Sequence, residues 1–500
     1  MDFIGIDVGT SGCKASVISE MGGVLKSARS EYKLSGGQSG LAVLSLTAVW
    51  NSVKAVLKEL APAAAGARAA MVSSLGETLA LVDKNGQLLL DDGITYMDRR
   101  NTEVWSRLKH RIPQEELYLT TGKTEPQIAA VNQYTYWKET KPEIFEKADQ
   151  IFFIDSYIAY LLCGEAMIDY SAASNTMCFD INSFEWSGSI AERYEMDLGL
   201  FPQIGRAGTR LGTVRKKWRE ELGLPADMEI LAGCHDQISA AVGGGAVRPG
   251  DAVLGEGSTE ALNLLTDREG ADRIRQAHLP MEPFVKKGMY VSLLSRLMHG
   301  NCLKWFIRNF AEALSAKCEK EGRSVYDDLN RNCAGLSGDI VFLPYLSSTC
   351  FTDIGQPMGS FIGMDAGSTV YHLYRGMLEG LCCESAEMFQ LLDDYGIPAD
   401  GVTAVGGVSR SAVYMQMKAD ITRKEIEVLK HAEAGVRGLA MLCAVEFGCC
   451  SGLEEAGRLF RETMCRYVPK KDSSGILERH RRLSKAVRTV YSELQNQHYD

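Results

Sequence analysis

Residues 4–18 read IGIDVGTSGCKASVI, two apolar runs on either side of a glycine-rich turn. Apolar runs that flank such a turn predict a β-hairpin. No helical pattern follows the turn, and the signatures GxxxxGK[ST] and GxGxxG are both absent from it. A P-loop or a Rossmann unit needs the glycine turn to open a helix, so this stretch argues against both of those nucleotide-binding folds.

A related pattern returns near the middle of the chain. Residues 251–265 read DAVLGEGSTEALNLL, again two apolar runs around glycine with two adjacent hydroxyl residues. The stretch immediately before it, GGGAVRPG at 243–250, is the best candidate for a linker. These positions predict two domains, 1–246 and 247–500, that each open with a hairpin.

The rest of the chain alternates strand and helix patterns, which predicts an α/β fold. Residues 151–154 predict a strand before a helical stretch at 157–162, and 229–232 predict a short strand that runs into a loop at 233–236. Helical spacing recurs in three later segments, which are 371–395, 410–422 and the charged terminal stretch 471–498.

Length and composition limit the class of protein. The 500 residues exceed one ordinary hydrophobic core, so two domains of roughly 250 residues are expected. A hydrophobic fraction of 45% and a charged fraction of 24% are those of a globular protein. The net charge of −10, without basic runs, argues against a nucleic-acid or anionic-membrane partner. It leaves room for a phosphate ligand, which backbone N–H groups can hold.

The same composition bears on location. The N-terminus has no basic region leading into a long apolar run, and no run of about 18 apolar residues occurs. We therefore expect no targeting segment, no membrane span and a cytoplasmic protein. The fourteen cysteines form no CxxC pair and no zinc-site spacing, which favours reduced thiols over a disulfide scaffold.

The first turn offers the groups that phosphoryl transfer requires. That reaction needs N–H groups and hydroxyls around the phosphate, a carboxylate for Mg²⁺, and a carboxylate that accepts a proton. The turn's glycines let the backbone approach a phosphate, Thr10 and Ser11 offer hydroxyls, and Lys14 offers a cation. Asp7, at the strand end, can face a hydrated cation. Taken alone, the segment is also explained as an ordinary hairpin turn.

Other candidate positions carry similar alternatives. Asp236 is either a helix N-cap or a catalytic carboxylate. Glu77 is either an exposed charge at a strand end or a ligand, and Asp98–Arg100 is either a solvated turn or part of a site. Gly406 and Gly407 either admit a flat ring against the backbone or form a plain strand–helix turn.

Taken together and in this order, the segments resemble the FGGY family of carbohydrate kinases, within the actin/hexokinase/Hsp70-like ATPase superfamily. The resemblance implies two ribonuclease H-like α/β domains with an interdomain cleft. Residues 1–246 would bind the sugar or polyol, and residues 247–500 would bind ATP. The matching blocks are Ile4–Ile18, Tyr96–Asn101, Thr121–Asp180, Gly233–Leu262, and Ala404–Val428 followed by Glu433–Gly435 and Gly438.

The resemblance also implies roles for single residues. Asp236 matches the family's catalytic base, and Asp7 matches the acidic residue near Mg²⁺. Two departures occur in the nucleotide segments, where Ser258 replaces a more usual threonine and Val408 replaces a third glycine. The implied ATP-binding residues are Thr10, Ser11, Lys14, Gly257, Ser258, Thr259, Gly406, Gly407 and Ser411. The implied substrate-binding residues are Glu77, Asp98, Arg99, Asp236 and Gln237.

The implied activity is ATP-dependent phosphorylation of a hydroxyl on a small sugar or polyol, of the xylulose, ribulose, glycerol or erythritol type. The acceptor stays open at this point. Gly76 stands where glycerol kinases carry arginine, the Met-His of xylulose kinases is missing, and Ser347–Cys350 replace a Gly-Glu-Arg-like run. The competing hypotheses are a non-kinase ATPase of the same superfamily and a sugar-sensing binding protein. Oligomeric state is open, with a homodimer as one alternative.

Overall fold

The computed structural model describes residues 1–36, 40–296, 299–336, 339–346 and 359–496. Residues Ser347–Cys350, where the sequence departs from the family, therefore lie outside the described residues. Contacts group the chain into two compact units. The first unit comprises Met1–Pro249, Leu264–Leu293 and Glu433–Arg461, and the second comprises Gly250–Asn263, Leu294–Ala432 and the residues from Glu462 onward. Two segments beyond the predicted boundary at residue 246 thus belong to the first unit.

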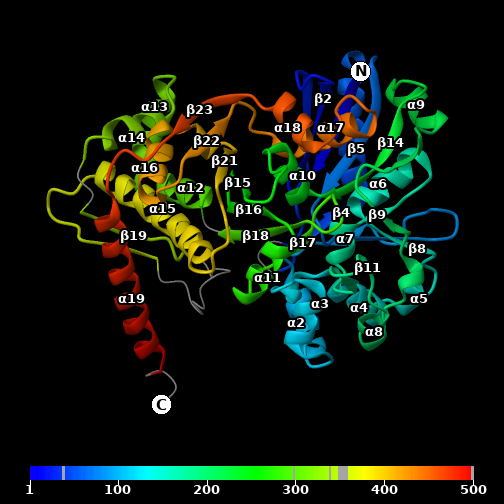
Figure 1. The fold of residues 1–500 in the computed structure, drawn as a ribbon, viewed down its shortest axis with the longest axis horizontal. Coiled ribbons are helices and arrows are strands. Elements are labelled where there is room, and N and C mark those ends of the chain that lie inside the picture. The colour runs from blue at the N-terminus through cyan, green and yellow to red at the C-terminus, as the bar shows by residue number, and fades with distance from the viewer. Residues whose placement is uncertain (37–39, 297–298, 337–338, 347–358, 497–500) are drawn as a thin grey trace. The chain divides into compact units, whose positions relative to one another are not determined.

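The first unit is built on a six-stranded sheet with the strand order β13-β14-β5-β1-β2-β3. Of these strands, β14, β5 and β2 are labelled in Figure 1. β1 and β2 form the antiparallel hairpin predicted from residues 4–18, with Asp7 opposite Lys14. β5 runs parallel to both β1 and β14. The strands of this sheet are β1 Asp2–Val8, β2 Gly12–Ser19, β3 Val24–Glu31, β5 Ala67–Ser74, β13 Arg210–Thr213 and β14 Glu229–His235.

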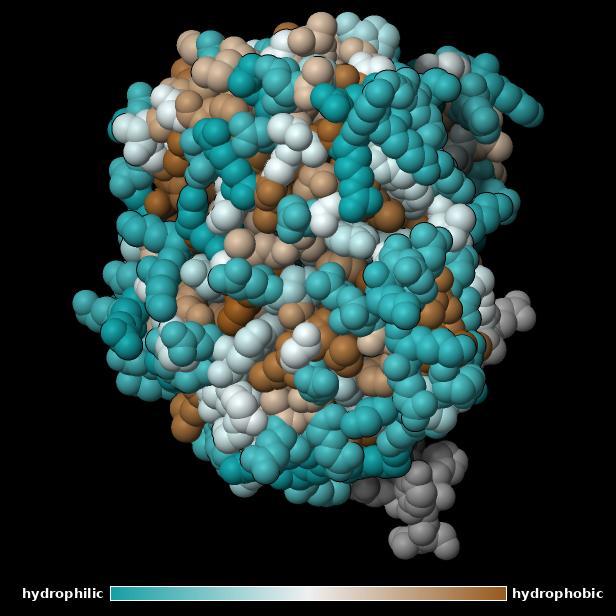
Figure 2. Space-filling model, turned by 90° about the vertical axis from the view of Figure 1, so that its right-hand side faces the viewer, coloured by the Kyte–Doolittle hydropathy of each residue, from teal (hydrophilic) through white to brown (hydrophobic). Residues whose placement is uncertain are grey.

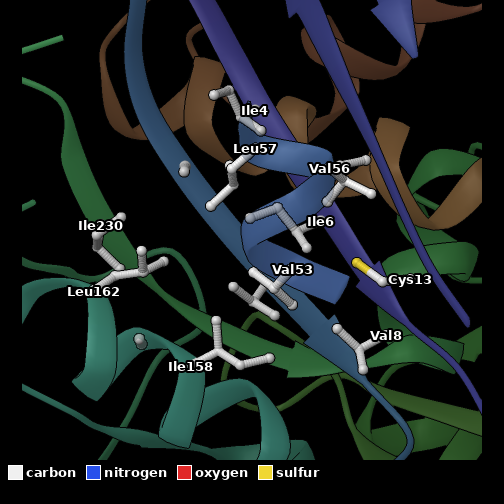
Figure 3. Close-up of a cluster of buried hydrophobic side chains, with 14 of the residues drawn as sticks. Ile4, Ile6, Val8, Cys13, Val53, Val56, Leu57, Ile158, Leu162 and Ile230 are labelled. Atoms are coloured by element: carbon white, nitrogen blue, oxygen red, sulfur yellow. The ribbon is translucent and has the colours of Figure 1, made fainter. Parts of the chain in front are cut away.

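One face of this sheet forms a hydrophobic core (Figure 3). Ile4, Ile6 and Val8 alternate along β1, and all three side chains are fully buried. α1 and α6 contribute residues such as Val53 and Ile158 to the same cluster. Each fully buried side chain of this kind contributes about 1.5–3 kcal/mol. The period-2 pattern of β1 therefore fixes which face points inward, and it leaves the polar strand end at Asp7 outside this core.

Two helices pack closely because glycines line their contact. A Cβ on Gly243 of α10 would lie 1.9 Å from the carbonyl oxygen of Ala434, and one on Gly438 of α17 would lie 1.9 Å from that of Ser239. Gly5 of β1 likewise faces the carbonyl of Val436, 2.3 Å from a built Cβ. This close packing is why α17, late in the chain, groups with the first unit.

Smaller elements complete the first unit. The helices are α1 Leu46–Leu60, α2 Arg99–Leu108, α3 Gln114–Thr121, α4 Ala130–Thr140, α5 Pro142–Phe145, α6 Ile154–Cys163, α7 Tyr170–Ser174, α8 Gly188–Arg193, α9 Lys216–Leu222, α10 Asp236–Gly243, α11 Arg268–Gln276, α17 Ala434–Glu446 and α18 Leu453–Phe460. The short strands are β4 Val43–Ser45, β6 Leu79–Val82, β7 Asp92–Ile94, β8 Gln150–Phe153, β9 Ile168–Asp169, β10 Phe179–Asp180, β11 Glu185–Trp186, β12 Ile204–Gly205 and β17 Glu282–Pro283.

The second unit is built around β15, β21, β22 and β23, four neighbouring strands of a seven-stranded sheet with the order β17-β18-β16-β15-β21-β22-β23. β15 and β22 both run parallel to β21. β15 and β16 are adjacent strands joined by the turn at 257–259, which confirms the second predicted hairpin. The strands are β15 Asp251–Glu256, β16 Glu260–Thr266, β18 Tyr290–Arg296, β19 Val341–Leu343, β20 Ser360–Ile362, β21 Gly401–Val405, β22 Ile426–Leu429 and β23 Thr463–Tyr467.

The predicted later helices are present, and one predicted loop is not. The segment 233–236 was expected to be a loop, but β14 continues to His235 and α10 begins at once with Asp236. The strand continues because β14 pairs with β5 as far as Ser74, after a register shift beyond Leu231. The helices of the second unit are α12 Gly300–Phe310, α13 Glu312–Lys320, α14 Val325–Cys333, α15 Val370–Asp394, α16 Ala412–Thr422 and α19 Ser474–Asn496.

The face of the molecule in Figure 2 carries hydrophilic residues over much of its area, with hydrophobic residues in small groups between them. Such scattered apolar surface is ordinary for a folded domain. Among the described residues, no helix combines the length and the apolar character that a membrane crossing requires. Each of the thirteen cysteines in the described part of the chain is a free thiol.

Candidate active site

The turn of the first hairpin presents unengaged hydroxyls. The N–H of Gly9 donates to the carbonyl oxygen of Gly12 at 3.0 Å, and the hydroxyl of Tyr32 donates to the carbonyl oxygen of Gly9 at 2.6 Å. These bonds hold the backbone of the turn. Within the described residues the side chains of Thr10 and Ser11 make no hydrogen bond, so both hydroxyls are available to a ligand.

Lys14 has a partner near this turn. Its ammonium group lies 2.8 Å from a carboxylate oxygen of Glu433, and both side chains are about half exposed. Glu433 directly precedes α17, so the close packing of that helix on β1 brings the carboxylate here. An exposed pair of this kind is weak and can be rearranged when an anion binds.

Two carboxylates lie at the carboxyl ends of β1 and β14, the two strands that run parallel to β5 on either side of it. Asp7 is the last residue but one of β1. The hydroxyl of Ser73, its partner on β5, donates to Oδ1 of Asp7 at 2.9 Å. Asp236 follows β14, on the other side of β5. Burial and the charge of Asp236 raise the pKa of Asp7 to about 7. Gly435 leaves room here, since a Cβ would lie only 3.3 Å from Cγ of Asp7.

The environment of Asp236 includes a charged histidine. Nε2 of His235 lies 3.3 Å from Oδ1 of Asp236, and Nδ1 lies 2.8 Å from Oε2 of Glu282. Burial alone would lower the pKa of His235, but the carboxylate of Glu282 raises it to about 10. Burial raises the pKa of Asp236 above its ordinary value, and the charge of His235 opposes that shift. Gln237 donates its amide to Oδ1 of Asp236 at 3.0 Å.

Glu282 has a second cationic partner. The ammonium of Lys123 bonds both to Glu282 and to Oδ1 of Asn175, each at 2.5 Å. Burial alone would raise the pKa of Glu282, but the charges of Lys123 and His235 hold it well below its usual range. Glu282 therefore stays ionised and links His235 to Lys123.

Glu77 lies in the same electrostatic neighbourhood and is free to bind. Its side chain is 8% exposed, and within the described residues its carboxylate accepts no hydrogen bond. Burial raises the pKa of Glu77 to about 7, with the charges of His235 and Lys123 acting against the shift. A buried carboxylate without a hydrogen-bond partner destabilises the ligand-free protein. A ligand hydroxyl that donates to Glu77 would remove this cost.

The space beside Gly76, where an arginine stands in glycerol kinases, is occupied. A Cβ on Gly76 would lie 2.2 Å from Nδ2 of Asn175 and 2.9 Å from Cδ2 of His235. Asn175 is buried, and Nδ2 has no hydrogen-bond partner within the described residues. Glycine at 76 thus lets an amide and an imidazole take the place that a longer side chain would fill.

The substrate-binding roles of Asp98 and Arg99 stay predictions, and the structure describes other contacts for both side chains. Both oxygens of Asp98 are engaged, by the N–H of Ala42 at 2.7 Å and by the guanidinium of Arg100 at 2.8 Å. Asp98 also caps α2 through the N–H of Arg100. The side chain of Arg99 is 62% exposed and lies near Glu103. The structure thus gives Asp98 a capping role, and Arg100 rather than Arg99 is its buried partner.

The second hairpin borders a cavity of about 450 Å³ in the second unit. The N–H groups of Gly300 and Asn301, at the start of α12, donate to the carbonyl oxygens of Gly257 and Ser258 at 3.1 and 3.0 Å. The ammonium of Lys304 lies 3.4 Å from the hydroxyl of Ser258. The cavity lining combines the implied ATP-binding residues Gly257, Ser258, Gly407 and Ser411 with apolar and aromatic residues such as Leu303, Tyr326, Tyr374 and Val408.

The two glycines after β21 differ. Gly406 has φ +106°, and a Cβ there would lie 2.5 Å from the carbonyl oxygen of Glu256. A Cβ on Gly407 would meet nothing within 4 Å, and this residue lines the cavity. The hydroxyl of Ser411 caps α16 by accepting from the N–H of Tyr414 at 3.3 Å. Gly406 therefore serves close backbone packing, whereas Gly407 leaves open space for a ligand.

These residues fit ATP and a hard divalent cation. The cavity volume falls within the range of about 300–1,000 Å³ that small-ligand pockets occupy, and its mixture of apolar walls and hydroxyls suits a nucleoside. Asp7 and Asp236 supply carboxylate oxygens, which are the ligands that Mg²⁺ prefers. The unengaged hydroxyls of Thr10 and Ser11 add donors for phosphate oxygens.

Sequence reasoning missed four residues of these sites, which are Lys123, Asn175, Glu282 and Lys304. Lys123 and Asn175 lie within a block that matched the family, yet no local pattern distinguishes them from surface residues. Glu282 belongs to β17, and a strand of two residues is too short to give a recognisable pattern in the sequence. For Lys304 a signal existed, since it lies one turn into the helix that Gly300 opens.

Comparison with known proteins identifies the family of this chain. The model of the FGGY family of carbohydrate kinases, N-terminal domain, matches residues 3–243, and that of the C-terminal domain matches residues 259–447. A xylulose kinase of Staphylococcus epidermidis is 24% identical over 495 residues, which cover 97% of this chain and 96% of that protein. An L-fuculokinase of Escherichia coli is 27% identical over 391 residues, which cover 78% and 79%. The crystal structure of xylulose kinase from Rhodospirillum rubrum superposes with a TM-score of 0.85 at 21% identity, covering 100% of both chains.

The chain therefore belongs to the FGGY family of carbohydrate kinases, and the predicted two-domain α/β fold of the actin-like ATPase type is confirmed. It is an ATP-dependent phosphotransferase whose acceptor is an alcohol group of a sugar or polyol. This membership decides against the alternative of a non-kinase ATPase.

Proposed function

We propose that Asp236 is the general base that takes the proton from the acceptor hydroxyl during phosphoryl transfer. The observation that carries this proposal is the position of Asp236 at the start of α10, beside Asp7 and within the His235–Glu282 chain. Burial raises the pKa of Asp236 toward the working pH, which suits a group that must accept a proton and later release it.

The other residues would bind and orient. Bound ATP supplies the phosphoryl group, and Mg²⁺ neutralises charge on its phosphate oxygens. Asp7 would hold the cation, directly or through water. Thr10, Ser11, Lys14 and Gly257–Thr259 would contact phosphate. The cavity beside Gly407 and Ser411 would hold the adenosine. In this proposal residues 1–246, together with Glu282, carry the acceptor site, and residues 247–500 carry most of the ATP site.

We further propose that the acceptor is an uncharged polyhydroxy compound. The cluster around Asp236 contains four carboxylates, on Asp7, Glu77, Asp236 and Glu282, against the two cations Lys123 and His235, and both cations already bond to Glu282. An incoming carboxylate would meet this excess of negative charge, while Lys14, whose charge acts on Asp7, is assigned to phosphate in this proposal. Hydroxyls can instead donate to Glu77 and accept from Nδ2 of Asn175. Xylulose and fuculose, the sugars in the names of two relatives, are neutral ketoses of this class.

The test is acceptor-dependent ADP release from purified protein. The panel pairs neutral ketoses and polyols with aldonic acids of the same chain length, with ATP alone as the background. We expect activity with at least one neutral compound and none above background with its aldonate. Activity that is highest with an aldonate would refute the neutral acceptor alone. An absence of acceptor-dependent ADP release across the whole panel would refute the sugar or polyol assignment.

A further inference from the structure

A cluster of charged side chains lies fully buried behind the turn of the second hairpin. Glu256, Glu260, His299 and Lys418 are each at most 1% exposed. The ammonium of Lys418 bonds to a carboxylate oxygen of Glu256 and to one of Glu260, the latter at 2.5 Å. Nε2 of His299 lies 2.6 Å from the other oxygen of Glu256. The phosphoryl-transfer scheme above uses none of these four residues.

The cluster connects three segments that line the nucleotide cavity. Glu256 and Glu260 directly flank the turn 257–259, at the end of β15 and the start of β16. His299 directly precedes α12, and its N–H donates to the carbonyl oxygen of Ser258 at 3.3 Å. Lys418 projects from α16, the helix that Ser411 caps. One ammonium group thereby ties the helix on the adenosine side of the cavity to the turn on the phosphate side.

The ammonium of Lys418 offsets part of the carboxylate charge in this cluster. Burial alone would raise the pKa of Glu256, but the ammonium of Lys418 keeps it at about 2. Burial alone would lower the pKa of Lys418, but the charges of Glu256 and Glu260 raise it above the ordinary value. Glu256 is also part of the lining of the cavity. Without Lys418, its carboxylate would repel an anionic nucleotide at short range in a medium of low dielectric constant.

Glu256, Glu260 and His299 are spaced like the ligands of a metal ion, but in this cluster a lysine takes the place of the cation. Oxygens of Glu256 and Glu260 and a nitrogen of His299 lie within 4.8 Å of one another, close enough to hold an ion. The ammonium of Lys418 already bonds to both carboxylates, so the cation of this cluster is supplied by the chain itself.

We infer that Lys418 is a positioning residue for ATP, which holds the turn 257–259 in place and offsets the charge of Glu256, a residue of the cavity lining. This inference rests on the proposed ATP site. It concerns binding of the charged part of the nucleotide, and it leaves the acceptor site untouched. Adenosine, which carries no phosphate, therefore serves as the ligand that separates charge compensation from loss of the cavity.

The experiment measures ATP and adenosine affinity by calorimetry, and KM for ATP and for the acceptor, in Lys418→Met. We expect a loss of ATP affinity of at least tenfold, an adenosine affinity within about threefold of the parent, and an unchanged acceptor KM. Adding Glu256→Gln should restore ATP affinity to within about threefold, because the uncompensated carboxylate is then gone. Lys430→Met is the matched control, since Lys430 forms an exposed pair with Glu462.

Two double variants keep the inference testable if Lys418→Met fails to fold. E256Q/K418M and E260Q/K418M have the same net charge, but only E260Q/K418M retains the carboxylate of Glu256, which is the residue of the two that belongs to the cavity lining. We expect E256Q/K418M to bind ATP at least fivefold more tightly than E260Q/K418M. Equal ATP affinity of the two double variants, or a folded Lys418→Met with parental ATP affinity, overturns the inference. A parent protein that binds neither ATP nor adenosine would refute the proposed nucleotide site instead.

Discussion

Nδ1 of His235 lies 2.8 Å from Oε2 of Glu282, although 47 residues of chain separate them. The other nitrogen of the same ring lies 3.3 Å from the carboxylate of Asp236. The carboxylate of Glu282 thus stabilises the protonated imidazole, and the other ring nitrogen lies against the carboxylate of Asp236, the proposed base. A strand of two residues, β17, supplies the first of these carboxylates.

Replacing Glu282 with Gln should destabilise the protein in a pH-dependent way. The pKa of His235 is raised to about 10, above its ordinary value near 6.5, so this pair contributes stability that is complete below pH 6.5 and lost as pH rises toward 10. Breaking a buried pair of this kind costs about 3–5 kcal/mol. The gap in Tm between parent and variant should be largest near pH 6 and narrow toward pH 10. A gap that stays constant over this range contradicts the prediction, and Glu269→Gln, an exposed residue of α11, is the control.

Asp236→Asn should remove acceptor phosphorylation while leaving nucleotide binding in place. A positioned general base contributes about 10²- to 10⁴-fold, so kcat should fall by that factor. ATP affinity, measured by calorimetry, should stay within about twofold. Asp227→Asn provides a control because that carboxylate is exposed and pairs with Arg68. Turnover of Asp236→Asn close to the parental value would show that another group accepts the proton.

Glu77→Gln should stabilise the ligand-free protein and weaken acceptor binding. Burial raises the pKa of Glu77 to about 7 from 4.5, so its ionisation opposes folding increasingly as pH rises through that interval. At 1.36 kcal/mol for each pKa unit, the neutral amide should add up to about 3 kcal/mol at pH 8 and almost nothing near pH 4.5. Thermal melts at both pH values test the stability, and KM for the acceptor should rise while KM for ATP does not. Glu103→Gln is the exposed control, and an equal gain in Tm at both pH values would contradict the assignment.

Gly76→Ala should impair the acceptor site selectively. The added Cβ would collide with Nδ2 of Asn175 and approach Cδ2 of His235, both of which belong to the cluster around Asp236. We expect a higher KM for the acceptor with an unchanged KM for ATP. Gly188→Ala is a matched control, since a Cβ there meets nothing within 4 Å. An unchanged acceptor KM in a folded Gly76→Ala would place the acceptor elsewhere.

The neighbouring glycines 406 and 407 should respond differently to alanine. Gly406 combines a positive φ with a Cβ position 2.5 Å from the carbonyl oxygen of Glu256, so Gly406→Ala should cost about 1–3 kcal/mol of stability. Gly407→Ala should leave Tm unchanged and raise KM for ATP, because the methyl group would enter the cavity. Denaturant unfolding and initial-rate kinetics distinguish the two outcomes. If Gly407→Ala leaves KM for ATP unchanged, the nucleotide does not approach that residue.

Much of the fold was predictable because its signals are local. The apolar alternation around residues 9–12 and 257–259 indicates hairpins, and both hairpins are present. The loop expected at 233–236 was wrong because β14 continues by pairing with β5, a strand more than 150 residues earlier in the chain. Strand ends depend on such pairing, which neighbouring residues in the sequence do not report.

The sequence by itself determined the two glycine turns and the α/β alternation, since each follows from residues close together in the chain. The roles of Asp7 and Asp236 follow from the family resemblance and stay predictions. Only the tertiary structure decided which charges meet. It brought Glu282 to His235, returned α17 to the first unit beside Asp7, and set Lys418 between Glu256 and Glu260. A charged residue reads as a surface residue in sequence, because the energy that keeps it buried comes from a partner far along the chain.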